Sequence, residues 1–152
     1  MAFGPQGRYL AMGGSGRDLH VTEVRNRRIV WEKGEKDLRF PVRSVAFSAD
    51  EHYLAVGSED GTARLFEVQS GNEVRQWTHR GAVGAVAFSR DGRYLATGSD
   101  DGAAHVFDVV DGREVLRQPH KHAVASVAFS ADQRLASGST DGSVGSNQGG
   151  IS

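Results

Sequence analysis

Short apolar runs alternate with polar turns along the whole chain, and the third quarter of the sequence shows the pattern most clearly. Residues 84–89 form a nearly continuous apolar run, which is typical of a strand covered on both faces. An Asp-Gly pair follows, which supplies the positive φ of a tight hairpin, and residues 94–98 form the next apolar run. Residues 103–109 predict a third strand. Residues 113–117 predict a fourth, more polar strand, which we expect at an outer edge.

The predicted unit is therefore an antiparallel meander of four strands. A helix is excluded, because a Gly or an Asp-Gly pair interrupts every window that could keep apolar residues at i, i+3, i+4 and i+7. Equivalent strands are predicted at residues 18–24 and 28–32, at residues 72–77, and at residues 125–130 and 134–138. The sequence predicts an all-β fold.

The same unit recurs at a nearly fixed distance. The dipeptide Ala-Phe begins at residues 2, 46, 87 and 128, so the spacings are 44, 41 and 41 residues. Residues 46–61 return almost unchanged as residues 87–102 and, one residue shorter, as residues 128–142. A period of this length predicts an array of identical units, each of which buries its faces on its neighbours.

The period, the four strands and the pattern Phe-Ser-x-Asp-Gly-x-Tyr-Leu-Ala-x-Gly-Ser-x-Asp-Gly resemble the WD-repeat β-propeller family. The resemblance covers residues 1–144 and implies blades at residues 1–37, 38–78, 79–119 and, in part, 120–144, followed by a low-complexity tail at residues 145–152. The family's Gly-His dipeptide is absent. The Trp-Asp pair that closes its third strand is replaced by Thr22-Glu23, Phe66-Glu67 and Phe107-Asp108, and the two tryptophans, Trp31 and Trp77, lie in predicted fourth strands.

The resemblance also implies a buried polar network in each blade, made of a histidine, a second-strand Ser or Thr, a turn aspartate and a tryptophan. The matching residues are His79, Thr97, Ser99 and Asp101 in the third copy, His120, Ser137, Ser139 and Asp141 in the fourth, and Asp60 in the second, where Leu38 replaces the histidine. Ser, His and Asp also build hydrolase sites. A catalytic set is needed once, however, whereas a network that satisfies buried polar groups is needed in every blade. We therefore predict a structural network and no catalytic residues.

The copies supply three complete blades and part of a fourth, so a single chain does not close a ring of about 4–8 blades. In the fourth copy Asn147 aligns with Phe107, and we expect the tail to be disordered or improvised. An open arc exposes the outward faces of its end blades. We therefore expect a homo-oligomer or a complementary propeller segment to close the ring. The alternative is a fragment of a longer propeller protein without independent function.

Composition excludes several classes of partner. A formal net charge of -1 argues against general binding of nucleic acid or of an acidic membrane surface. The chain has no cysteine, and we expect a cytoplasmic location. No signal peptide is visible at the start, and no apolar run approaches the roughly 18 residues of a membrane span.

Three motifs that suggest ligands are outweighed by simpler interpretations. The His-x-His at residues 120–122 has no further metal ligands nearby, and the acidic turns at residues 59–60 and 100–101 lack a calcium-binding loop. The Gly-rich residues 13–17 precede no helix, so they do not form a phosphate loop. We predict no metal and no cofactor.

The connections between blades remain the candidate interaction surface. The longest, residues 33–41, carries Arg39 and Phe40, an aromatic–Arg pair with the composition of an interface hot spot, unless Phe40 packs on the blade beneath. With Arg80, Lys121 and His122 this pair forms a candidate interaction rim. The predicted function is a non-catalytic protein-interaction scaffold. An enzyme with a channel-mouth site is the less favoured alternative.

Overall fold

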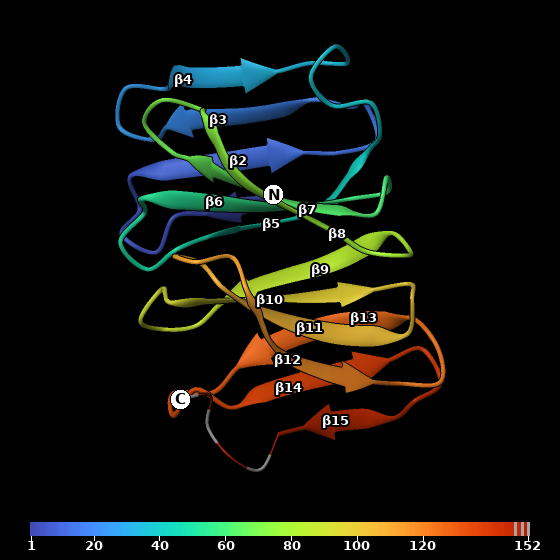
Figure 1. Ribbon diagram of the computed structural model, residues 1–152. Coiled ribbons are helices and arrows are strands. Elements are labelled where there is room, and N and C mark those ends of the chain that lie inside the picture. The colour runs from blue at the N-terminus through green and yellow to red at the C-terminus, as the bar shows by residue number, and fades with distance from the viewer. Residues whose placement is uncertain (148, 150, 152) are drawn as a thin grey trace.

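The computed structural model describes residues 1–147, 149 and 151, and this part of the chain folds into four antiparallel sheets (Figure 1). The first sheet holds β1 (Ala2–Phe3), β2 (Tyr9–Gly13), β3 (Leu19–Glu23) and β4 (Arg28–Lys33). The second holds β5 (Val42–Phe47), β6 (Tyr53–Ser58), β7 (Thr62–Glu67) and β8 (Glu73–Thr78). The third holds β9 (Val83–Phe88), β10 (Tyr94–Ser99), β11 (Ala103–Asp108) and β12 (Glu114–Pro119). The fourth holds β13 (Val124–Phe129), β14 (Leu135–Ser139) and β15 (Val144–Ser146).

The predicted all-β arc, with three four-stranded blades and a partial fourth, is confirmed. Figure 1 shows the sheets following one another from the first blade at the top to the partial blade at the bottom. Within each sheet the strands lie in chain order, because tight turns connect them. The Asp-Gly turns between second and third strands repeat closely, and Gly61, Gly102 and Gly142 all have a φ of 83°. The described residues contain no helix long and apolar enough to cross a membrane.

The hydrophobic core lies between the blades. Each blade presents a preceding face to the blade before it and a following face to the blade after it. At the first seam Ala11 and Val21 of the first blade pack against Leu54 and Phe66 of the second. The two later seams repeat this arrangement with buried residues from the second and third blades and from the third and fourth blades. Each blade is therefore stabilised by burial against its neighbours.

The fourth-strand tryptophans connect neighbouring blades. The indole N–H of Trp31 donates to the Val68 carbonyl at 2.7 Å, and that of Trp77 donates to the Gly112 carbonyl at 2.9 Å. The Trp77 ring also stacks on Phe107, with ring centroids 5.0 Å apart. Both bonds run from one blade to the hairpin between the third and fourth strands of the next. The sequence placed these tryptophans in the fourth strands but gave no indication of this contact.

The fourth blade is completed in an irregular way. β15 pairs with β14, with Gly145 opposite Ser137, so ordered pairing continues two residues past the expected end of the blade at residue 144. Asn147 exchanges hydrogen bonds with Leu135: its backbone N–H donates to the Leu135 carbonyl, and its side-chain oxygen accepts from the Leu135 N–H. Ile151 packs against the core of the last seam. Residues 148, 150 and 152 of the predicted tail lie outside the described residues.

Two substitutions at Trp77 separate the contribution of its hydrogen bond to Gly112 from that of its stacking on Phe107. Trp77→Phe keeps an aromatic ring but leaves the Gly112 carbonyl without its donor, and we expect it to lower the free energy of unfolding by about 1–2 kcal/mol. Trp77→Ala also removes the stacking on Phe107, and we expect a loss of about 3–5 kcal/mol. Equilibrium urea unfolding followed by circular dichroism measures both. Val74→Ala, on the exposed side of the same strand, is the control. An unchanged Trp77→Phe variant would show that the bond between blades contributes nothing.

Candidate interaction rim and the polar network beneath it

The three connections between blades lie at one end of the arc, at the right in Figure 1, and we call this end the rim. The connections carry Arg39, Arg80 and Lys121 at equivalent positions, spaced by 41 residues, and all three side chains are exposed. Within the described part of the chain, none of the three lies within 4.0 Å of a carboxylate. Each connection therefore carries a cation without an ion pair at this position, and the first connection also carries the exposed Lys36, which forms no ion pair among the described residues.

Phe40 and His122 lie beside these cations. Phe40 is 47% exposed, whereas Leu38, from the same connection, is buried in the first seam. Leu38 thus fills the position beneath the loop, and the aromatic side chain of Phe40 remains accessible. His122 is exposed, and its backbone carbonyl accepts a hydrogen bond from Ser139. The structure places all five predicted rim residues on the surface.

Several acidic turn residues at the rim are paired within the protein, whereas Glu35 and Asp37, on the connection that carries Arg39, form no ion pair among the described residues. Arg43 contacts Glu59 at 3.1 Å and Asp100 at 3.8 Å, and Arg64 contacts Asp60 at 2.8 Å. Burial tends to raise the pKa of Asp60, but hydrogen bonds from Thr62 and the charge of Arg64 outweigh it and hold this pKa below its usual value. Asp60 is therefore ionised and neutralised locally. The cations at the equivalent connection positions remain without such partners.

The predicted polar residues of the third blade lie together, but their partners differ from the expected triangle. His79 Nε2 is 2.8 Å from the hydroxyl of Thr97. Ser99 donates to the Gly81 carbonyl and accepts from the Asp101 N–H. The Asp101 carboxylate lies 3.2 Å from His105 rather than bonding His79.

His105 was missed by sequence reasoning, although a signal for it was present. It lies four residues after the turn aspartate, where the second blade has Arg64, so both blades place a basic side chain against that carboxylate. His105 also contacts Glu114, with 2.6 Å between Nδ1 and the carboxylate. The basic residue therefore links the turn to the fourth strand.

The environment of His79 favours its neutral form. The residue is 9% exposed, and its ring meets that of His105 edge to face at 4.7 Å between centroids. Burial, and after it the charge of His105, lowers the pKa of His79 from its ordinary 6.5. Among the described residues, His79 Nδ1 has no hydrogen-bond partner. Protonation would place a charge in a site that is built for a neutral ring.

The fourth blade has a simpler network. His120 lies between two hydroxyls, 2.8 Å from Ser137 and 3.1 Å from Ser143. Asp141 accepts the Ser143 N–H, and hydrogen bonds from Ser143 lower its pKa to about 2. The Asp141 N–H in turn lies 3.4 Å from the hydroxyl of Ser139. The polar groups of the turn therefore have different hydrogen-bond partners in the third and fourth blades.

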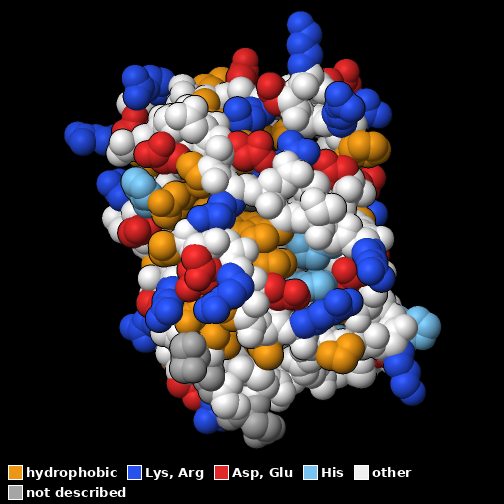
Figure 2. Space-filling model, viewed as in Figure 1, with side chains coloured by type: hydrophobic (Ala, Val, Ile, Leu, Met, Phe, Trp, Pro, Cys, Tyr) orange, Lys and Arg blue, Asp and Glu red, His pale blue; other side chains and the backbone are white. Residues whose placement is uncertain are grey.

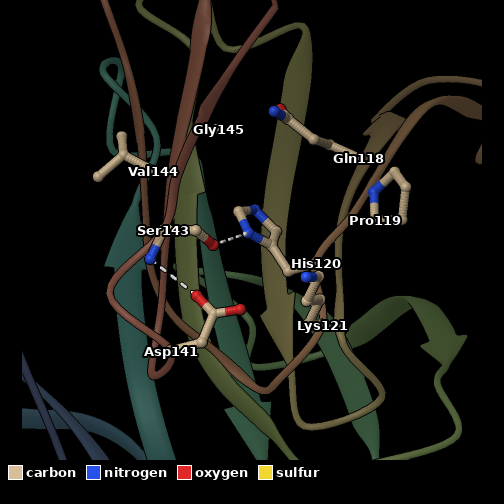
Figure 3. Close-up of a pocket in the computed structure, with 8 residues that line it drawn as sticks. All are labelled: Gln118, Pro119, His120, Lys121, Asp141, Ser143, Val144 and Gly145. Atoms are coloured by element: carbon tan, nitrogen blue, oxygen red, sulfur yellow. Dashed lines mark hydrogen bonds between the residues drawn. The ribbon is translucent and has the colours of Figure 1, made fainter.

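A groove of about 790 Å³ opens at the rim between the third and fourth blades (Figure 3). Figure 3 shows His120 directed toward Ser143 and Asp141, with Lys121 at the same edge. The remaining lining residues are Gln118, Pro119, Val144 and Gly145.

Two residue differences account for the groove. Gly145 occupies the position of His105, and Gln118 occupies the position of Trp77, so two large side chains are absent. A Cβ atom on Gly145 would lie 2.0 Å from the Gln118 amide nitrogen, so the glutamine side chain fills part of that space. Within the described residues the buried Gln118 Oε1 has no hydrogen-bond partner. The sequence pattern alone does not predict this groove.

The polar contacts beneath the rim are repeated from blade to blade. The His–hydroxyl contacts recur in the third and fourth blades, as expected of a network that supports each blade. Within the part of the chain that the structure describes, no group of three or more His, Asp or Glu side chains is placed to hold a metal ion.

The buried state of His79 predicts a pH dependence of stability. The folded-state pKa lies below the unfolded value, so the unfolded chain binds a proton that the folded chain resists. The stabilisation is present above the unfolded pKa and is lost as the pH falls from about 7 to about 5, by up to about 1.4 kcal/mol per pH unit. We expect His79→Gln to show a shallower loss in urea unfolding over this range. His122→Gln, at an exposed position, is the control. Equal slopes for wild type and His79→Gln would contradict the assignment.

Comparisons with known proteins agree with this architecture. The model of the anaphase-promoting complex subunit 4 WD40 domain matches residues 1–81, and that of the WD domain, G-beta repeat, matches residues 71–108 and 113–145. The crystal structure of the RRP9 WD40 repeats is similar with a TM-score of 0.87 at 24% identity, and the match covers 94% of this chain and 45% of that chain. The chain thus spans less than half the length of that relative.

A computationally designed protein, Ika4, is similar with a TM-score of 0.80 at 22% identity, and the match covers 92% of this chain and 84% of that chain. The matched family models together extend over both the complete blades and the partial blade. The chain therefore belongs to the WD-repeat β-propeller family.

Proposed function

We propose that this protein is a non-catalytic protein-interaction module that binds an acidic segment of a partner protein along its rim. WD40 repeats generally mediate protein–protein interaction. The observation that carries the proposal is the row of exposed cations at Arg39, Arg80 and Lys121, which form no ion pair within the described residues. Because the blades are packed together, the backbone positions that carry these cations are held at fixed separations before a partner arrives.

The surface around Arg39, Arg80 and Lys121 carries mixed charge, which favours recognition at the rim over a general electrostatic attraction. Figure 2 shows positive and negative side chains interspersed over one face of the protein, and the formal net charge is only -1. A partner would therefore be selected by the pattern of charges at the rim. Phe40 provides an apolar anchor beside Arg39, and a groove lined in part by Gln118 and His120 opens beside Lys121.

We further propose that the module works within a larger propeller, either an oligomer or a longer polypeptide. The match to less than half of the RRP9 chain supports this proposal. In either arrangement the rim keeps the same residues, because the connections lie within the arc.

Charge reversal at the rim tests the proposal. Arg39→Glu, Arg80→Glu and Lys121→Glu together should weaken binding of a fluorescent deca-glutamate peptide at least about tenfold, because each exposed attraction becomes a repulsion. Fluorescence anisotropy at low and moderate salt measures the affinity. The control reverses Arg25, Arg27 and Arg90, which are exposed on turns at the opposite end of the blades. Equal losses for the two triple variants would show non-specific attraction and would refute the rim.

The contribution of the Arg39–Phe40 pair can be measured separately. Phe40→Ala with Arg39→Ala should reduce recovery of protein partners in a pull-down from cell extract, because an aromatic anchor and a neighbouring cation are removed together. Leu38 is left in place, so the packing beneath the loop is preserved. Unchanged recovery would remove this pair from the binding surface.

A further inference from the structure

The preceding face of the first blade is apolar and uncovered. Phe3 is 62% exposed, Met12 41% and Val24 40%, and Ile29 lies on the same face, opposite Thr22 in the sheet. Leu10, which pairs with Phe3, adds to these apolar side chains, and Thr22 and His20 are polar residues among them on the same side of the sheet. Such a surface usually marks a contact with another protein surface.

The equivalent positions of the second blade show what covers this face in a blade that has a neighbour. In the second blade the equivalent of Phe3 is Phe47, which is 9% exposed, and the equivalents of Met12 and Val24 are Val56 and Val68, which are both fully buried. Phe47 lies beside the ring of Tyr9 from the blade before, with centroids 6.5 Å apart. The uncovered face of the first blade therefore repeats a surface that fits the following face of another blade.

One following face is also uncovered, and it belongs to the fourth blade. Its residues are exposed and mostly small, namely Ala128, Arg134, Ala136, Val144 and Ser146. Ala136 takes the position of Ala96, and Val144 takes that of Ala104, both of which are buried at a seam in the third blade. The chain thus presents both halves of one interface at opposite ends of the arc.

Arg134 places a positive charge on this following face, unlike that of the third blade. It stands where the third blade has Tyr94, a residue of the last buried seam. Its guanidinium is half exposed and is held by Asp132 at 2.9 Å. A guanidinium can stack on an aromatic ring, so Phe3 of another blade could meet Arg134 as Phe47 meets Tyr9.

We propose that the preceding face of the first blade packs on the following face of the fourth blade of a second copy, and that two such seams join two copies in one ring. The inference rests on the part of the proposed function that places the arc in an oligomer, and it is independent of binding at the rim. The arc holds three complete blades and a partial fourth, so two copies would supply seven to eight blades, within the range of about 4–8 blades for a closed ring.

Mass measurements on the 152-residue chain test the seam. Light scattering behind a sizing column should give about twice the monomer mass of 16.3 kDa. Phe3→Asp and Ala136→Lys should each shift the protein to the monomer mass, because each charge lies on one half of the interface. Both positions are at least partly exposed in a single copy, and circular dichroism checks that the sheets remain. Val110→Asp, at an exposed apolar position outside both faces, should keep the wild-type mass.

Mixing the two variants distinguishes this seam from other contacts. An equal mixture of Phe3→Asp and Ala136→Lys should recover the doubled mass, because one seam is unaltered and the other brings an aspartate to a lysine. A wild-type monomer, or a mass that grows steadily with concentration, would overturn the two-copy ring. A doubled mass for Ala136→Lys alone would also overturn it, since first blades would then pair with each other. Deca-glutamate binding by each variant reports the rim separately.

Discussion

The seam between neighbouring blades is the interaction on which the rest of the structure depends. A small antiparallel sheet cannot bury its own faces, so it is stable only when other elements cover them. Every core cluster here combines residues from two consecutive blades, and Phe47 beside Tyr9 is one example. The indole bonds of Trp31 and Trp77 cross the same seams and fix each blade against a hairpin of the next. Fold, rim and groove all follow from this stacking.

Repetition explains why so much of the fold could be predicted from sequence. The strands and Asp-Gly turns are local features, and their recurrence showed which residues occupy equivalent positions. The period therefore predicted the blades and the placement of Arg39, Arg80 and Lys121 on equivalent connections. It also identified Asn147 as the position where a core aromatic is lost, and the structure shows Asn147 bonding Leu135 there instead.

The features that the sequence did not predict depend on residues that meet only across a seam or within a folded turn. Trp77 bonds a carbonyl 35 residues away, in the next blade, and nothing in its own repeat identifies that acceptor. The groove beside Lys121 requires residues smaller than Trp77 and His105 at facing positions in different blades, namely Gln118 and Gly145. His105 was overlooked for another reason, since the family pattern directs attention to His79 and away from the residue that actually pairs with Asp101.

The variable positions give each blade a distinct chemistry on a common backbone. Four residues after the turn aspartate, the second blade carries Arg64, the third His105 and the fourth Gly145, and these choices give an ion pair, a buried histidine contact and an open groove. The first two contact the carboxylate of the turn aspartate, which also accepts a backbone N–H of the same turn. Because Asp60 has Arg64 as an ionic partner, and Glu59 and Asp100 have Arg43, these carboxylates form no ion pair with the connection cations. This pairing keeps the turn carboxylates away from the connection cations, which supports the proposed role of those cations in binding a partner.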